Sequence, residues 1–415
     1  MSTAISASAG PAEGIGARAA GATSIAAPAR NLAVDAYRGL VMLLMMGEVM
    51  RFADTAKAFP GNFVWRWLAY NQTHVEWAGM SLHDTIQPGF TFLVGVALPY
   101  SVRSRQAKGD SFRRILAHTI WRSFVLIALG VFLRSTSGPI TYYTFEDTLS
   151  QIGLGYTFGF LLVYARPRVQ WIALVGILFG YWLLWALYPA PGPGFDFATV
   201  GVPQGWKGQI YSGFAAHWNK NTNIGNAFDV WFLNLFPRMK PFRYNDGGYL
   251  TLSFIPTLGT MLLGVIAGRW FLETRPKVPL RRFLLAAAGL MAAGLLLHFA
   301  GICPIVKRIW TPAWTLWSGG VCFAFLAAFA WIVDVNGHRK IAFPLVVVGM
   351  NSIAAYMMAH LWEEFLESSF RIHLGEGFLS LWGPGLEPFF LGVLTMLAYW
   401  SILYWMYRNR IFIKI

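Results

Sequence analysis

The sequence predicts an all-α, polytopic membrane helix bundle. Of its 415 residues, 56% are hydrophobic and only 13% are charged, whereas soluble domains carry about 25% charged residues. The apolar residues gather into runs close to the roughly 20 residues that a helix needs to cross a bilayer. About ten transmembrane helices are expected from these runs, at approximately 34–52, 83–102, 115–134, 147–165, 170–188, 249–271, 281–300, 314–333, 343–365 and 386–406.

The first 30 residues differ from the rest of the chain. They are rich in Ala, Gly and Ser and hold few large apolar residues. This composition lacks the apolar core of a signal peptide and buries too little surface to fold. We expect residues 1–30 to form a disordered cytoplasmic tail and residues 31–415 to form one membrane domain.

The distribution of basic residues predicts the orientation. A net charge of +14 in a soluble protein would suggest a nucleic-acid partner. Here the Lys and Arg residues cluster in short segments between apolar runs, on the side that also holds both chain ends, so membrane topology explains them and no nucleic acid is expected. Both termini should therefore be cytoplasmic, and the loop around residue 74 should lie on the outer side.

The connection 189–248 is the longest one between apolar runs, and the orientation places it outside. Its Pro and Gly residues predict turns, and the stretch Asn226–Phe236 is suited to a short interfacial helix. Loops of this length in compact proteins are often functional, for example as lids.

The segment 71–95, NQTHVEWAGMSLHDTIQPGFTFLVG, concentrates polar groups at the edge of an apolar run. It carries His74, Glu76, His83, Asp84 and Gln87, which hydrocarbon tolerates only when they are paired or wetted. His74 is suited to proton transfer near neutral pH, and Asp84 is placed to hold one imidazole nitrogen while the other faces a substrate. The plainer alternatives are an exposed loop histidine and a helix-capping aspartate.

From Asp84 onward, small and polar residues recur at three- and four-residue spacing, which places them on one helix face. We expect this stripe to line a cavity; it consists of Asp84, Gln87, Pro88, Thr91 and Gly95.

Further polar residues lie within four other apolar runs, so that five runs in all carry such groups. Arginines near a membrane surface can extend toward water, and small polar residues can join helices. Groups spread over so many helices are, however, typical of bundles that surround a shared cavity. The residues concerned are Asp35, Arg38, Glu48, Arg122, Gln151, Asn351, Ser352 and His360.

Several motifs in order resemble one known family. VDAYRGLVMLLM, HVEWAGMSLHDTIQPGFTFLVG, TIWRSFVLIALGV, LSQIGLGYTF, YNDGGYLTLSFIPTLGTMLLGVIAG and GMNSI are similar to the transmembrane core of the heparan-α-glucosaminide N-acetyltransferase family and its bacterial relatives. The resemblance runs from about residue 31 to 415, apart from 189–243. It implies a transmembrane acyltransferase of the bacterial inner membrane that moves acetyl groups from cytosolic acetyl-CoA to an amino sugar or related glycan.

The family's H-x-x-W-x-G stretch corresponds to residues 74–79, and its aspartate ten residues later corresponds to Asp84. The resemblance thus implies that His74 and Asp84 are catalytic, with His74 as a general base or as an acetyl carrier. The chain departs from the family at Glu48, where an asparagine is usual, and at Asn245-Asp246-Gly247-Gly248, where the family has Asp-Pro-Glu-Gly.

The remaining expected site residues fall into two sets. Arginine binds phosphate through its bidentate fork, so cations near the cytoplasmic side are assigned to CoA. The expected cofactor-binding residues are Arg38, Arg122, Gln151, Asn351 and Ser352, and the expected acceptor-binding residues are Glu48, Glu76, Trp77, Gln87 and Asp246.

No metal is expected, because Cys303, Cys322 and the histidines show no ligand spacing. A homodimer is an open alternative to a monomer. A secondary transporter of a small anionic or sugar substrate remains the main alternative function, since buried charges in about ten helices also suit a carrier. A non-catalytic membrane subunit is the third.

Overall fold

The computed structural model describes residues 31–383 and 385–413, and the expected disordered tail 1–30 lies outside them. The described residues form helices and loops without a β-strand. The α-helices in chain order are α1 (Leu32–Met46), α2 (Phe52–Ala58), α3 (Phe63–Gln72), α4 (Ile86–Ala107), α5 (Phe112–Ser135), α6 (Thr148–Val163), α7 (Pro167–Leu187), α8 (Ile224–Leu233), α9 (Phe254–Thr274), α10 (Leu280–Phe299), α11 (Pro312–Ala330), α12 (Arg339–Met350), α13 (Ser352–Leu361), α14 (Glu363–Leu374), α15 (Glu376–Leu379) and α16 (Glu387–Arg408).

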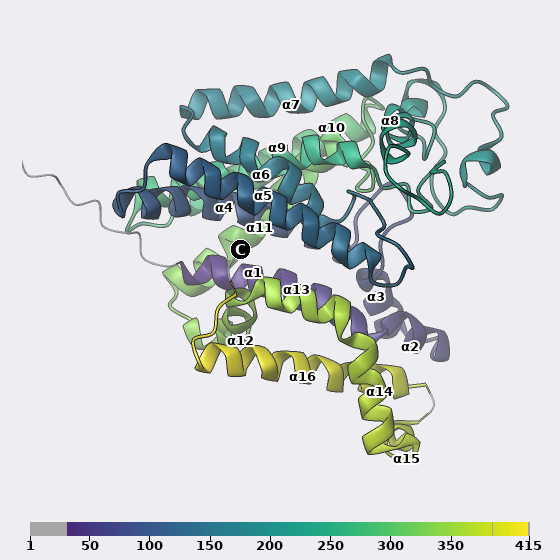
Figure 1. The fold of residues 1–415 in the computed structure, drawn as a ribbon, viewed down its shortest axis with the longest axis vertical. Helices are drawn as coiled ribbons and strands as arrows, with labels where there is room; N and C mark the ends of the chain where they lie inside the picture. The colour runs from purple at the N-terminus through teal and green to yellow at the C-terminus, as the bar shows by residue number, and fades with distance from the viewer. Residues whose placement is uncertain (1–30, 384, 414–415) are drawn as a thin grey trace, which may run out of the picture.

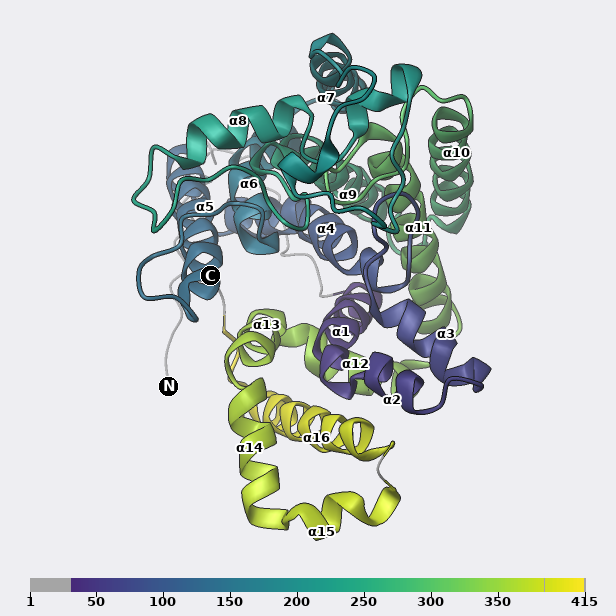
Figure 2. The ribbon, with the colours of Figure 1, turned by 90° about the vertical axis from the view of Figure 1, so that its right-hand side faces the viewer.

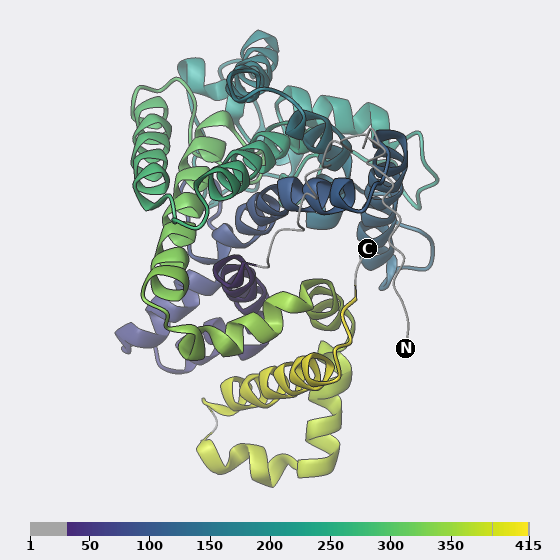
Figure 3. The same cartoon turned by 90° about the vertical axis from the view of Figure 1, so that its left-hand side faces the viewer.

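The helices form two groups with α1 between them (Figures 1 and 2). The larger group contains α4 to α11, and the smaller one contains α12 to α16. Figure 3 looks onto the end of the bundle where α1 begins and the C-terminal tail ends, whereas α2, α3 and α8 lie at the opposite end. The loop that carries residue 74 directly follows α3, so it lies far from the described chain ends, as the predicted topology requires.

The all-α, multi-pass membrane architecture is confirmed. Within residues 31–383 and 385–413, six helices are long and apolar enough to cross a bilayer. They are α5, α7, α10 and α16, together with α9 and α11 in the extended ranges Thr251–Thr274 and Pro312–Val335. Each of the ten predicted runs coincides with a helix or a helix pair, but the count of ten spans stays a prediction.

The run predicted at 343–365 is a broken helix. The pair α12 and α13 bends by 68° at Asn351, whose backbone leaves the helical region (φ −125°, ψ 43°). The Asn351 side chain binds the C-terminal tail on both sides, since its Nδ2 donates to Ile411 O at 2.9 Å and its Oδ1 accepts from Ile413 N at 3.1 Å. The break therefore anchors the tail beside α13.

Helices α4 and α9 approach closely through glycines. A Cβ added at Gly95 would lie 2.0 Å from the backbone oxygen of Met261, and one added at Gly264 would lie 2.0 Å from that of Phe92. Such contacts are typical of small residues between membrane helices. The prediction that Gly95 lines a cavity is therefore wrong, because the glycine face of α4 is closed by α9.

The long connection 189–248 packs onto the loop around residue 74. Its predicted helix is present as α8. Trp77 is fully buried with Trp185 and Trp218 in a second apolar core at this end of the molecule, and its Nε1 donates to Trp218 O at 3.1 Å. This packing fixes the loop that carries His74.

Candidate active site

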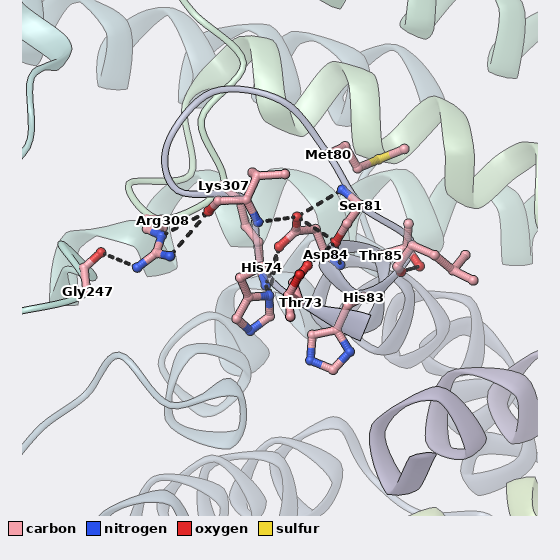
Figure 4. A network of polar contacts seen from close by, with 12 residues as sticks. Thr73, His74, Met80, Ser81, His83, Asp84, Thr85, Gly247, Lys307 and Arg308 are labelled. Atoms are coloured by element: carbon pink, nitrogen blue, oxygen red, sulfur yellow. Dashed lines mark hydrogen bonds and ion pairs between the residues drawn. The ribbon is translucent and has the colours of Figure 1, made fainter. Parts of the chain in front are cut away.

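His74 and Asp84 form a hydrogen-bonded pair, with 2.8 Å between His74 Nδ1 and Asp84 Oδ1 (Figure 4). His74 lies in the loop after α3. Asp84 lies in a single 3₁₀ turn, His83–Thr85, ahead of α4, because the helix begins at Ile86 rather than at the predicted residue 83. The pair is thus held at the mouth of the bundle, ahead of the first residue of α4.

The Asp84 carboxylate is fully buried and heavily hydrogen-bonded. Its Oδ2 accepts from Ser81 N at 3.0 Å, Ser81 Oγ at 3.1 Å and Val75 N at 3.3 Å. These donors come from both sides of the loop, so they lock the carboxylate and leave Oδ1 aimed at the imidazole. The residue acts as a fixed anchor and not as a helix cap alone.

A third charged group, Lys307, completes this centre. Its Nζ lies 3.1 Å from Asp84 Oδ1 and 3.0 Å from His74 Nδ1, and its side chain is only 5% exposed. Lys307 belongs to the loop between α10 and α11, more than 200 residues from His74, and was not predicted. A signal was present: Lys307 and Arg308 are adjacent cations in a short loop on the predicted outer side.

Burial and neighbouring charges shift the pKa values of Asp84 and His74. Burial alone would raise the pKa of Asp84, but the hydrogen bond from His74 and the charge of Lys307 hold that pKa well below its usual range. Withdrawal from water lowers the pKa of His74, and Lys307 lowers it further, while Asp84 opposes both effects. The imidazole therefore favours its neutral form, which is the form that can accept a proton.

His74 opens onto a cavity of about 260 Å³, here called cavity A. The bond to Asp84 occupies Nδ1, so Nε2 is the nitrogen that faces this space. His83 lies beside His74, with ring centroids 4.6 Å apart, and its Nε2 contacts Glu48 Oε1 at 3.0 Å. The other polar residues that line cavity A are Gln87, Arg134, Glu146, Thr148, Tyr249, Lys307, Tyr356 and His360.

A larger cavity of about 730 Å³, here called cavity B, lies nearer the C-terminal tail. Arg38, Arg105 and Arg122 line it, together with Ser352 and Ile413. Arg38 is paired with Asp35 at 3.1 Å. Arg122 stacks on Tyr156, with its Cζ 4.9 Å from the ring centroid, and its buried Nε has no hydrogen-bond partner among the described residues. Cavity B is thus lined by cations, and one of them, Arg122, has an N–H group that is available to donate a hydrogen bond.

Cavities A and B are neighbours along three helices. Gln87 of α4 lines cavity A and Phe90 lines cavity B; Thr148 and Ile152 of α6 are divided in the same way. On α13, Tyr356 and Ile353 repeat the pattern. A helix rises 1.5 Å per residue, so these pairs are about 4.5–6 Å apart along each axis. Only about one helical turn separates the two spaces.

Five of the predicted binding residues line neither cavity. Gln151 is buried, and its Nε2 donates to Phe145 O at 2.7 Å and Thr251 O at 3.1 Å. Asn351 binds the tail, and Trp77 lies in the apolar core. Glu76 accepts from Trp206 Nε1 at 3.2 Å, and Asp246 is exposed on the loop. By contrast, Arg38, Arg122 and Ser352 meet in cavity B, and Glu48 and Gln87 meet in cavity A. The binding roles of all these residues stay predictions.

No group of three His, Cys, Asp or Glu side chains suited to a metal occurs within residues 31–383 and 385–413. Cys303 and Cys322 are buried free thiols.

Comparison with known proteins gives two relatives. No family model matches the chain. The chain is 25% identical to human heparan-alpha-glucosaminide N-acetyltransferase over 94% of its own length, and 23% identical to the mouse protein of that name over 82%. It spans 60% of the human protein and 54% of the mouse protein. These similarities confirm the resemblance seen in the motifs and support membership of the chain in the group of proteins like heparan-alpha-glucosaminide N-acetyltransferase.

Proposed function

We propose that this protein is a membrane-bound acyltransferase that moves an acetyl group from acetyl-CoA to an amino sugar or a related glycan acceptor. The observation that carries the proposal is the arrangement of the two cavities. A buried carboxylate holds an imidazole at cavity A, and a cation-lined cavity B lies about one helical turn away. The similarity to two proteins named as N-acetyltransferases supports the same reaction class.

Cavity B is suited to the nucleotide part of acetyl-CoA. The CoA nucleotide carries a pyrophosphate and a 3′-phosphate, and arginine is the side chain best suited to bind phosphate oxygens. Arg122 is the strongest binding residue, because its Nε is buried without a partner among the described residues. Arg38 and Arg105 add positive charge. The volume of about 730 Å³ falls within the range of pockets for ligands of this kind.

The acetyl thioester would reach His74 between α4, α6 and α13, where the two cavities approach each other. The amine nitrogen of the acceptor attacks the thioester carbonyl carbon, and His74 Nε2 takes the proton that the nitrogen loses. The C–S bond then breaks, and the CoA sulfur receives the proton from Nε2. Asp84 keeps the proton on Nδ1 throughout. General-base catalysis of this kind contributes about 10²–10⁴-fold.

A covalent route uses the same groups. Nε2 attacks the thioester first, and the acetyl group then passes from the imidazole to the amine, which gives ping-pong kinetics. Both routes need a neutral His74 and an acceptor in cavity A. The carboxylates of Glu48 and Glu146 and the hydroxyls of Tyr249 and Tyr356 offer such an acceptor hydrogen-bond partners for an ammonium group and hydroxyls.

The proposed setting is the bacterial inner membrane with both termini in the cytoplasm. Cavity B lies near the C-terminal tail and would then open to cytosolic acetyl-CoA. Cavity A, which His74 lines, would open to the opposite side. The reaction would pass an acetyl group across the membrane without moving CoA itself.

The test uses purified protein in liposomes with acetyl-labelled acetyl-CoA and glucosamine. We expect the wild type to form labelled N-acetylglucosamine and His74→Ala to bind acetyl-CoA without transferring its label. His373→Ala is the matched control, because His373 is exposed on α14 and lines neither cavity. Transfer by His74→Ala at the wild-type rate would contradict the proposal, as would accumulation of unmodified sugar inside the liposomes without acetylation.

A further inference from the structure

Lys307 is held at the His74–Asp84 pair by a rigid loop. Arg308, its neighbour, donates through Nη1 to Gly247 O at 2.8 Å and through Nη2 to Val75 O at 3.2 Å (Figure 4). Gly79 N also donates to Ile305 O at 3.1 Å. The 300–311 loop is therefore tied to the loop of His74 on both sides of Lys307, so the ammonium is placed by the backbone and not by a chance side-chain conformation.

The position of this ammonium creates two possible hydrogen-bond arrangements. Asp84 Oδ1 can accept from His74 Nδ1–H and Lys307 Nζ–H together, and then His74 Nε2 carries a free lone pair. Alternatively, Lys307 Nζ donates to Nδ1, and then Nε2 carries the proton. Only the first arrangement allows Nε2 to act as a base toward cavity A. The distances of 2.8 and 3.1 Å to Oδ1 accommodate that arrangement directly.

A carboxylate alone beside an imidazole has two effects that conflict. It fixes the tautomer through its hydrogen bond, but its negative charge also favours the imidazolium cation, which cannot accept a further proton. A buried ammonium on the same oxygen cancels the charge of the carboxylate and leaves the hydrogen bond in place.

We propose that Lys307 is a positioning residue for His74: it neutralises Asp84, so that the carboxylate orients the imidazole without charging it. The inference rests on the proposed function only where it concerns catalysis. The protonation of His74 can be measured in the absence of any reaction. Lys307 reaches His74 through Asp84 and Nδ1, and its side chain also lines cavity A.

Other ionisable groups face His74 and must be held constant in a test. His83 stacks beside His74 and contacts Glu48. Besides Lys307, the other ionisable residues that line cavity A are Arg134, Glu146, Tyr249, Tyr356 and His360. None of these contacts Lys307 by a hydrogen bond or ion pair in the described residues. A substitution at residue 307 therefore changes one charge beside His74 and leaves the rest of the surroundings in place.

The experiment follows carbethoxylation of His74 by diethylpyrocarbonate as a function of pH, read by mass spectrometry on the full chain. The reagent acylates the neutral imidazole only. We expect Lys307→Met to raise the midpoint of labelling by about one pH unit, since a charge within 4–6 Å shifts a pKa by about 1–3 units. At the wild-type midpoint the labelling rate should fall about fivefold, as a shift of one unit requires.

Lys307→Arg, which keeps the charge, should retain the wild-type midpoint. If Lys307→Met does not yield folded protein, Lys307→Gln serves the same comparison, because it removes the charge and keeps a donor for Asp84. An unchanged midpoint in the uncharged variant, or an equal shift in Lys307→Arg, would overturn the inference. A wild type that labels as expected but transfers no acetyl group would instead refute the proposed function and leave the assignment of Lys307 standing.

Discussion

Two buried aspartates at the same end of this molecule are held in opposite ways. Asp84 is fully buried and contacts both Lys307 and His74, and its pKa is held well below the usual range. Asp229 of α8 is 1% exposed. Its Oδ2 accepts from Thr251 N at 2.9 Å, but its Oδ1 has no hydrogen-bond partner among the described residues. Burial raises the pKa of Asp229 to about 7.

The difference shows what burial alone does and what a partner adds. Removing a carboxylate from water favours its neutral form, and one backbone N–H does not reverse that effect at Asp229. At Asp84 a cation and several N–H and O–H donors do reverse it. Of these two aspartates, only Asp84 is held as a permanent negative charge, and it is the one that contacts a histidine, which is the reason to place the chemistry at Asp84.

The sharpest test of this contrast exchanges each carboxylate for an amide. Asp84→Asn should lower acetyl transfer by about 10³-fold, because the amide no longer fixes the proton on Nδ1 and general-base catalysis is lost. Asp229→Asn should leave the rate within about twofold, since ordinary substitutions away from the chemistry change little. Initial rates with saturating acetyl-CoA give the comparison. Equal losses in the two variants would show that burial, and not position, decides the effect.

The same pair should differ in the pH dependence of stability. Asp229 has a raised folded-state pKa, so folding is favoured most at low pH and weakened as pH rises from about 4 through about 7. The penalty above pH 7 approaches about 4 kcal/mol, and Asp229→Asn should remove it. Asp84 behaves in the opposite sense, because its stabilisation is present at neutral pH and is lost as pH falls below about 4.

Thermal unfolding in detergent between pH 5 and 8 measures both effects. Asp229→Asn should gain stability over the wild type at pH 8 and little at pH 5. Asp84→Asn should lose stability throughout this range. A wild type equally stable at pH 5 and pH 8, matched by Asp229→Asn, would show that Asp229 is not the buried group described here.

A smaller effect is expected from the same contrast among cations. Arg38 is paired with Asp35, whereas the buried Nε of Arg122 has no partner within the described residues. Arg122→Ala should raise the KM for acetyl-CoA about tenfold, the equivalent of about 1.4 kcal/mol, and should do so more strongly than Arg38→Ala. The KM for the acceptor is the control. A rise confined to the acceptor KM would place the phosphates elsewhere.

The smallest change is expected at Glu76. Its carboxylate accepts from Trp206 Nε1 at the surface and lines neither cavity. Glu76→Gln keeps that bond, so the KM for the acceptor should change by less than about twofold, in line with exposed substitutions elsewhere. A rise of tenfold or more in the KM for the acceptor would show that Glu76 belongs to the acceptor site, as the sequence analysis predicted.

The membrane bundle could be predicted because hydropathy is a local property. Each of the apolar runs that form α5, α7, α10, α11 and α16 can be recognised from the hydropathy of its own residues. The break at Asn351 could not be predicted, because it depends on hydrogen bonds to residues 411 and 413.

The same division holds for the candidate site. His74 and Asp84 are ten residues apart at one loop, so their pairing could be anticipated, although their catalytic roles are still untested. Lys307 is distant in sequence and joins them only through the fold. Trp77 was expected at a binding surface, yet a core that also includes Trp218 from the long loop covers it. Whether an aromatic residue is exposed depends on partners that spacing does not reveal.

A structure of the protein with acetyl-CoA, determined by cryo-electron microscopy, tests the central claim most directly. The account predicts the phosphates beside Arg122 and Arg38 in cavity B, and the thioester between α4, α6 and α13 within reach of His74 Nε2. Phosphates bound outside cavity B, or a thioester that points away from His74, would contradict it.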